Sequence, residues 1–407
     1  MRNTLLVDNF QIHDGLENEE ETENAREHLQ GIDAKGDETV DENTEIEPTG
    51  KKSRAKIGKN RKRSSRFSRV FLICFVILGG LIAFSFDYHL PYYALKPGAA
   101  VPTNNLINIS GVKTSKIQGQ IDLVYVIESN VPLIVYPIDK FSSSVTLYKS
   151  SEIASTPTGI LSQSALDSQN AWFQNTSQIS AEVAALRSDG YTISSVNNGA
   201  LIGWIDPTAP ASKFLASGDK IVSVGAFKVS SDEDLVKAIQ SLKPHSEVTI
   251  GFVTPNSDKT NYQRVKLAAQ SGSSSNIPYL GVGLMPVYRI PLKISINDVV
   301  NGESLGGPSA GLAYSLTIVD MLEGGDLTKG ENIAATGTID SHGNVGPIGG
   351  LLQKTIAVLN AGCKIFFVPE GQSASTYSQI FKLAGNRMKI YKVETLNQVL
   401  SILKSGH

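Results

Sequence analysis

The stretch LGGPSAGLAY, residues 305–314, places one serine among glycine, proline and alanine residues, and an apolar sequence follows it. Pro308 suits the first position of a helix, where its missing N–H costs no hydrogen bond. We therefore predict that Ser309 lies in the first helical turn, where backbone N–H groups are unpaired and the helix dipole is positive. Gly306 and Gly307 would let another backbone approach closely. Taken alone, the stretch fits either a turn serine or a nucleophile.

A second glycine-rich stretch, IAATGTIDSHGNVGPIGGLLQK, spans residues 333–354 and ends in a lysine. Its pattern predicts a strand, a turn at 340–344, a second strand, and a helix that begins near Gly349 and Gly350. Lys354 would then lie in the first turns of an apolar helix. Burial lowers the pKa of a lysine from about 10.4, because it disfavours the ammonium form. A lysine of that kind can act as a base toward a serine hydroxyl.

Together, GPSAG at 307–311 and TGTID with GNVGPIGGLLQK, 45 residues from serine to lysine, resemble the proteolytic domain of Lon-type serine-lysine peptidases. The resemblance implies Ser309 as the nucleophile and Lys354 as the general base. It implies that Thr336 supports the dyad by a hydrogen bond to the amine. Backbone N–H groups at Ser309 and Ala310 would stabilise an oxyanion. One position departs from the family pattern, because Gly306 stands where typical members carry an aspartate.

Other readings of the same residues remain open. The segment GGLLQKT partly matches a phosphate-binding loop, but Gln353 replaces its glycine, so we expect no nucleotide and no cofactor. Substrates would then be loosely folded or extended chains, cleaved without ATP. His342 could serve a Ser-His-Asp hydrolase, although DSHGN is typical of an exposed turn. With an inactive dyad, the protein would be an anchored peptide-binding adaptor.

Residues 191–270 resemble PDZ domains. The matching features are a glycine before a predicted strand at 200–205, the segment SGDKIVSVGAF at 217–227, and a helix near 231–242 that Ser231 would cap. The resemblance implies that an extended peptide adds to a strand edge, with its C-terminus held by loop N–H groups. The loop residues so implied are Asn197, Asn198, Gly199 and Ala200.

The N-terminal part divides by charge. Residues 1–50 carry fifteen acidic and three basic residues, whereas residues 51–69 carry ten basic residues and no acidic one. The acidic part has little apolar surface to bury, so we expect a disordered tail over 1–69. Residues 70–86 are 17 apolar or small residues, and tyrosines follow where an interfacial belt would lie. We predict a transmembrane signal anchor at 70–87, with 1–69 cytoplasmic and 88–407 outside the cytoplasm, at the cell membrane.

The rest of the chain completes an α+β fold. We expect a linker and the N-terminal part of the protease domain at 91–190, the PDZ-like domain at 191–270, inserted or adjacent, and the Lon-type catalytic domain at 278–407. The resemblance implies that strands at 120–140 and a helix near 170–189 pack with the catalytic domain. The stretch 288–296 is expected to offer an edge to the substrate.

Composition limits the remaining options. With 41% hydrophobic and 19% charged residues and a net charge of −2, the chain is typical of a folded protein. Two cysteines and six scattered histidines without an HExxH motif predict neither a metal site nor a disulfide. The expected partners are protein or peptide substrates and the membrane, not nucleic acid. The resemblance also implies a homo-oligomer.

Overall fold

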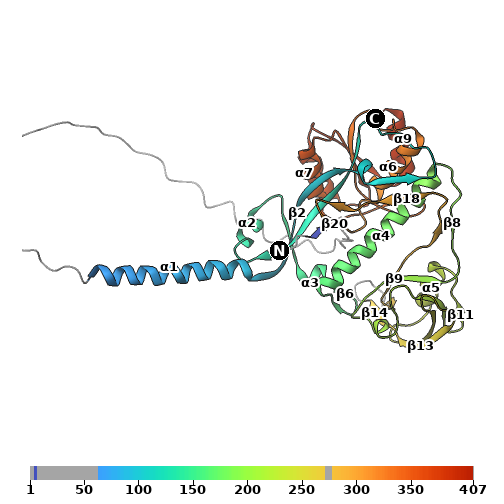
Figure 1. Cartoon of the computed structure of the whole chain (residues 1–407), viewed down its shortest axis with the longest axis horizontal. Coiled ribbons are helices and arrows are strands. Elements are labelled where there is room, and N and C mark those ends of the chain that lie inside the picture. Colours follow the sequence, from blue (N-terminus) through green and yellow to red (C-terminus); the bar gives the residue numbers. More distant parts are fainter. Residues whose placement is uncertain (1–3, 7–62, 271–276, 407) are drawn as a thin grey trace, which may run out of the picture. The chain divides into compact units, whose positions relative to one another are not determined.

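The computed structural model of the protein describes residues 4–6, 63–270 and 277–406 (Figure 1). Most of the predicted tail and the linker at 271–276 lie outside the described residues. The chain divides into two units. One comprises Met1–Ile12 and Ser85–His407, and the other comprises His13–Phe84.

Helix α1 (Arg63–Asp87) belongs mainly to the smaller unit. Its segment Arg69–Asp87 is 19 residues long and apolar enough to cross a membrane. Large apolar side chains such as Phe71 and Phe75 are exposed rather than packed within the protein. An exposed apolar helix of this length is what a hydrocarbon solvent would stabilise. The predicted helix at 70–87 is therefore present, and it could span a membrane.

The larger unit is built around a nine-stranded mixed sheet, and the helices that cover it follow in sequence order. The sheet runs in the order β19 (Val299–Val300), β20 (Glu303–Gly306), β1 (Thr4–Leu6), β4 (Gln120–Pro132), β21 (Asn332–Ala335), β24 (Ile365–Pro369) and β25 (Lys389–Val393), with β2 (His89–Pro102) on β4 and β5 (Thr146–Lys149) on β2. The helices are α2 (Tyr136–Phe141), α3 (Ser150–Ile153), α4 (Gln163–Ser188), α6 (Gly311–Glu323), α7 (Leu351–Ala361), α8 (Ala374–Ala384) and α9 (Leu396–Ser405), with the 3-10 turn η1 (Thr103–Asn105).

A smaller sheet holds the region that resembles PDZ domains. Its order is β13 (Thr260–Lys266), β12 (Glu247–Val253), β10 (Lys220–Val224), β9 (Ala200–Ile205) and β16 (Val282–Leu284), with β11 (Phe227–Lys228) on β10. Helix α5 (Asp232–Gln240) and the turn η2 (Pro210–Lys213) accompany it. Two-stranded pairs are β14 (Ala268–Gln270) with β15 (Ile277–Tyr279), β17 (Tyr288–Arg289) with β8 (Ser194–Ser195), β18 (Lys293–Ile296) with β3 (Ile107–Ser110), β22 (Thr338–Ile339) with β23 (Val345–Gly346), and β6 (Ser155–Thr156) with β7 (Gly159–Ile160).

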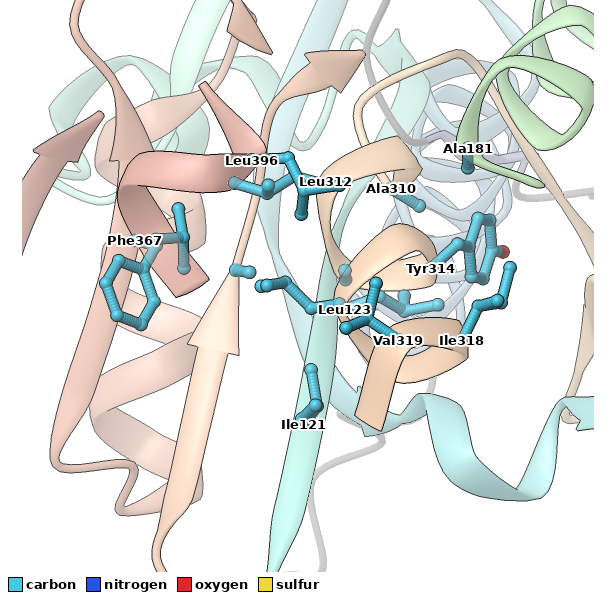
Figure 2. Packing of buried hydrophobic residues seen from close by; sticks show 14 of the residues in the cluster. Ile121, Leu123, Ala181, Ala310, Leu312, Tyr314, Ile318, Val319, Phe367 and Leu396 are labelled. Carbon is cyan, nitrogen blue, oxygen red and sulfur yellow. The ribbon is translucent and has the colours of Figure 1, made fainter. Parts of the chain in front are cut away.

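Strand β4 is the centre of the large sheet and is buried on both faces. Ile121 and Leu123 belong to the cluster that contains α6, whereas Val124 belongs to the cluster that contains α7 and α8. Figure 2 shows Ile121 and Leu123 of β4 beside Val319 of α6. Because successive side chains of a strand point to opposite faces, one strand contributes to both cores. Helices α6 and α7 are thereby fixed to the same sheet.

Helix α4 precedes the small sheet in the sequence and packs in the same core as α6. Its N-cap is Ser162, whose hydroxyl accepts a hydrogen bond from the Ala165 N–H, and it ends at Ser188. Ala181 and Ala184 of α4 lie in the same buried cluster as α6. Figure 2 shows Ala181 close to Tyr314 of α6. The small apolar side chains let these two helices approach closely.

Three expectations need correction. The predicted strand at 131–138 is wrong, because a turn closes from Pro132 to Val135 and Pro137 enters the first turn of α2. The small sheet also extends past residue 270, since β16 pairs with β9. The long strand expected over 288–296 is instead two short strands, and β18 already pairs with β3.

Candidate active site

Ser309 lies just before α6 and is fully buried. The helix begins at Gly311 with Ala310 as its N-cap, so the prediction of a first-turn serine was wrong by two residues. The cause is visible in the hydrogen bonds of its carbonyl oxygen. The Ser309 carbonyl accepts bonds from the Gly337 N–H at 2.9 Å and from the Thr336 hydroxyl at 3.2 Å. It is therefore committed to the neighbouring segment rather than to the helix.

Helix α4 holds the loop that precedes Ser309. The Ser177 hydroxyl donates to the Pro308 carbonyl at 2.8 Å. The Gly307 N–H donates to the Asn170 carbonyl at 3.2 Å, and Gly307 has a positive φ of 81° that favours glycine. These contacts fix the backbone on the N-terminal side of Ser309. Sequence reasoning missed Ser177 and Asn170, because nothing near them in the sequence marks a contact more than 130 residues away.

Lys354 reaches Ser309 from the other core. It is the fourth residue of α7, which begins after Gly350 in the left-handed region at φ 61°. Its side chain is fully buried, and its Nζ donates a hydrogen bond to the Ser309 Oγ. Complete burial disfavours the charged ammonium form. The two residues that the sequence singled out are thus brought together as a buried amine and hydroxyl.

Thr336 contacts Ser309 through the backbone. Its hydroxyl donates a hydrogen bond to the Ser309 carbonyl, and the expected bond between this hydroxyl and the Lys354 amine stays a prediction. The Thr336 N–H donates to the Phe367 carbonyl of β24 at 3.0 Å. A buried threonine so anchored links Ser309 to the large sheet.

The backbone N–H groups of Ser309 and Ala310 are the ones that we predicted for an oxyanion site, and that role stays a prediction. Among the hydrogen bonds of the described residues, none is donated by the N–H of Ser309 or of Ala310. Both residues are fully buried. A buried N–H without a partner is costly, so these groups are suited to a ligand oxygen.

The surroundings of His342 differ from those of Ser309 and Lys354. It is exposed, in the turn between β22 and β23, and its backbone N–H donates to the Asp340 carboxylate at 2.8 Å. The Asp340 carboxylate also accepts the Asn344 N–H at 2.9 Å, which closes the turn. Such a turn accounts for the residue without catalysis. No cluster that could hold a metal ion occurs within residues 4–6, 63–270 and 277–406.

The predicted peptide-binding loop precedes β9. Gly199 has φ 122°, and its N–H donates to the Ser230 carbonyl at 3.0 Å. Ala200 begins β9, which pairs with β10 on one edge and with β16 on the other. Asn197 and Asn198 lie in the connection before it. β9 therefore has no edge for an added strand, and peptide binding at 197–200 stays a prediction.

Comparison with known proteins identifies the catalytic part. Residues 302–405 match the Lon protease (S16) C-terminal proteolytic domain. Lon protease of Azorhizobium caulinodans is 30% identical over 148 residues, which are 36% of this chain and 17% of that protein. Lon protease of Trichlorobacter lovleyi is 35% identical over 96 residues, which are 24% of this chain and 11% of that protein. The chain thus matches only a small part of the length of these relatives.

A solved structure resembles another part of the chain. The PDZ domain of an SdrC-like protein from Listeria monocytogenes is 24% identical, with a TM-score of 0.19, and the match covers 21% of this chain and 87% of that domain. The mixed helix-and-strand fold and the match at 302–405 agree with the α+β prediction. Residues 302–405 of this chain, which contain both Ser309 and Lys354, are thus similar to the Lon protease (S16) C-terminal proteolytic domain.

Proposed function

We propose that this protein is a membrane-anchored, ATP-independent serine endopeptidase that cleaves loosely folded or extended chains outside the cytoplasm. The hydrogen bond between the buried Lys354 amine and the Ser309 hydroxyl carries the proposal. An amine kept neutral by burial can take the hydroxyl proton as the oxygen attacks a carbonyl carbon. The match of residues 302–405 to a protease domain supports the same chemistry.

The proposed reaction has two steps. The Ser309 Oγ attacks the scissile carbonyl carbon while the Lys354 Nζ accepts its proton. The N–H groups of Ser309 and Ala310 stabilise the negative oxygen of the tetrahedral intermediate. The Lys354 ammonium then protonates the leaving amine, and an acyl-enzyme remains on Ser309. Water, deprotonated by the same amine, hydrolyses the ester and restores the dyad.

Other parts of the proposal rest on separate features. The segment that partly matched a phosphate loop forms the start of α7 and presents Lys354 to Ser309, which supports an ATP-independent reaction. Anchoring rests on α1 and on the basic residues before it. Peptide recognition by the smaller sheet would use β16, the terminal strand, which pairs with β9 on its inner edge.

The test compares wild type with Ser309→Ala and Lys354→Ala, each purified in detergent as the full chain. We expect the wild type to cleave a disordered protein such as casein without added nucleotide. Each variant should lose at least about a thousandfold in rate, because a nucleophile or its base is removed. Thermal unfolding of each variant shows that the fold persists. Wild-type cleavage rates in either variant would reject the dyad, and a wild type without activity would favour the anchored adaptor.

A further inference from the structure

Helix α1 joins the sheet of the larger unit without a linker. One residue, Tyr88, separates α1 from β2. The carbonyl of Ser85, in the last turn of α1, accepts a hydrogen bond from the Ile134 N–H at 3.2 Å. The Tyr88 carbonyl accepts one from the Leu133 N–H at 2.9 Å. Ser85 and the residues after it belong to the larger unit, so the end of α1 is fixed to the segment that follows β4.

This segment is close enough to α1 for one bilayer to touch both. Arg69–Asp87 is the part of α1 that could span a membrane. The polar interface of a bilayer is roughly 5–8 Å thick on each side of its hydrocarbon core. Helix α2 begins three residues after Leu133 and, with six residues, rises only about 9 Å along its axis. The exposed side chains of residues 133–141 can therefore reach the interface at which α1 ends.

Helix α2 is apolar on its exposed side and acidic on its buried side. Phe141 is 86% exposed and Ile138 is 70% exposed. These residues are three positions apart, so they lie on one face of the helix. Asp139 is buried, and its carboxylate pairs with the Lys96 Nζ at 2.9 Å. A surface helix that faces water has the opposite arrangement, with its charged residues outside and its apolar residues inside.

The exposed apolar surface continues from α2 to the end of α1. Phe86, Tyr88 and Leu133 are exposed there as well. The Tyr136 ring packs against the ring of Tyr92 in β2, with centroids 5.5 Å apart, and this contact holds α2 on the sheet. We call the exposed apolar residues around the end of α1 the apolar patch: Phe86, Tyr88, Leu133, Ile138 and Phe141.

The composition of the apolar patch matches the boundary between lipid headgroups and acyl chains. Tyrosine is enriched at this level of a membrane, where its ring is in lipid and its hydroxyl in water. Phenylalanine and isoleucine suit the acyl side of the boundary. Lys140 is exposed beside the patch, with its Nζ 5.7 Å from the centroid of the Tyr136 ring. Its apolar stem can lie along the acyl chains while its ammonium group stays among the headgroups.

We propose that the apolar patch inserts into the bilayer interface at which α1 ends, and that the larger unit thereby has a second attachment to the membrane. The partner is the phospholipid bilayer, and the inference rests on the proposed anchoring by α1. Two attachments hold the larger unit in one orientation, because rotation about the axis of α1 would draw Ile138 and Phe141 out of the lipid. A fixed orientation also fixes the direction from which a chain reaches Ser309.

The experiment measures the depth of single fluorescent labels in phosphatidylcholine nanodiscs that contain the full chain. An NBD label is attached to one cysteine at a time in Ile138→Cys, Phe141→Cys and the control Tyr262→Cys, each combined with Cys74→Ser. Tyr262 is an exposed aromatic residue of β13 in the small sheet. Cys363 is buried, and the pKa of its thiol is raised to about 12, chiefly by burial, so it stays unlabelled. The quenchers are phospholipids with a nitroxide near the headgroup end or near the middle of the acyl chain.

Native Cys74 tests the anchoring separately. It lies within the part of α1 that could span a membrane, and it is exposed there. Its label, in the otherwise unchanged chain, should be quenched by the lipid nitroxides. A Cys74 label that no lipid nitroxide quenches would reject the membrane span and this inference together. Thermal unfolding of each labelled variant checks that it is folded.

We expect the shallow nitroxide to quench the labels at 138 and 141 at least about twofold more strongly than the label at 262, and more strongly than the deep nitroxide does, because an interfacial helix lies near the headgroups. Quenching at 138 and 141 that does not exceed quenching at 262, with the Cys74 label quenched, would overturn the inference and leave the anchoring intact. Labels at 138 and 141 that are shielded from aqueous iodide but not quenched by lipid would assign the patch to a second copy of the chain, which also overturns the lipid contact.

Discussion

At the scale of single residues, the site depends on how the peptide of Ser309 is held. Its carbonyl accepts two hydrogen bonds, from the Gly337 N–H and the Thr336 hydroxyl. Its side chain accepts one from the Lys354 amine. Ser309 is therefore constrained at both ends, and its Oγ has little freedom to leave the amine. Holding a reacting oxygen in place accelerates a reaction, although the groups that hold it do not contact the substrate.

Thr336→Val tests that role. The change removes one buried hydrogen bond and keeps the side-chain shape, so stability should fall by about 1 kcal/mol. We expect kcat to fall severalfold with little change in KM, because Thr336 positions the nucleophile and does not bind substrate. Thr336→Ser should restore the rate, since its hydroxyl can reach the same carbonyl. Steady-state kinetics with a defined peptide decide the point, and an unchanged kcat in Thr336→Val would refute the positioning role.

At the scale of elements, the close approach of α4 to α6 supports the loop of Ser309. Gly311 opens α6 beneath the Ser177 hydroxyl, and that hydroxyl holds the Pro308 carbonyl. A Cβ at Gly311 would lie 2.8 Å from Ile339 Cγ2 and 2.9 Å from Ser177 Oγ. Both distances are shorter than carbon and oxygen atoms tolerate. The glycine thus serves packing at the junction of the two helices.

Gly311→Ala should therefore destabilise the protein by about 1–3 kcal/mol through overpacking. It should also reduce the cleavage rate, because Ser177 must move and with it Pro308. Gly371→Ala is the matched control, since its Cβ would meet Pro347 only at an ordinary 3.8 Å. Calorimetry and casein cleavage measure the two effects. Equal melting temperatures for both variants would contradict this account of the junction.

The elements also show what a sequence can predict. α7, the turn at 340–344 and the buried strand β24 follow from local signals: a glycine pair, the turn sequence DSHGN and an apolar run. The start of α6 did not follow from its sequence, because a long-range bond to Gly337 takes the Ser309 carbonyl. α2 replaced a predicted strand, since Pro137 fits a helical first turn as well as an extended run.

At the scale of the whole molecule, stability should depend on a carboxyl group of α4. Burial raises the pKa of Glu182 from 4.5 to about 7. Between these values the folded protein binds a proton that the unfolded chain has released, so stability falls as the pH rises from about 4.5 to about 7. Since Glu182 is not fully buried, solvent screening keeps the total loss below about 3 kcal/mol.

Glu182→Gln should remove this dependence. We expect the variant to be more stable than wild type at pH 8 by about 1–2 kcal/mol, and nearly equal to it at pH 5, where the wild-type carboxyl is protonated. Urea unfolding at the two pH values measures the difference. A variant that is less stable than wild type at pH 8 would show that the Glu182 carboxylate is stabilised by contacts of its charged form.

The orientation of the chain across the membrane is a property of the whole molecule. If residues 51–69 hold the N-terminus in the cytoplasm, as we propose, protease added to intact cells should digest an epitope at the C-terminus and spare one at the N-terminus. Lysed cells provide the control, because both epitopes should then be lost. Protection of the C-terminal epitope in intact cells would contradict the proposed orientation.

The central claim is that Lys354 activates Ser309 as a nucleophile. The most direct measurement is rapid quenching of the reaction with a peptidyl ester, followed by mass spectrometry of the intact protein and of its fragments. We predict an acyl adduct on Ser309 in the wild type, and no such adduct in Ser309→Ala or Lys354→Ala, although both variants fold. An adduct on any other residue, or one that forms on Ser309 at the wild-type rate without Lys354, would contradict the account.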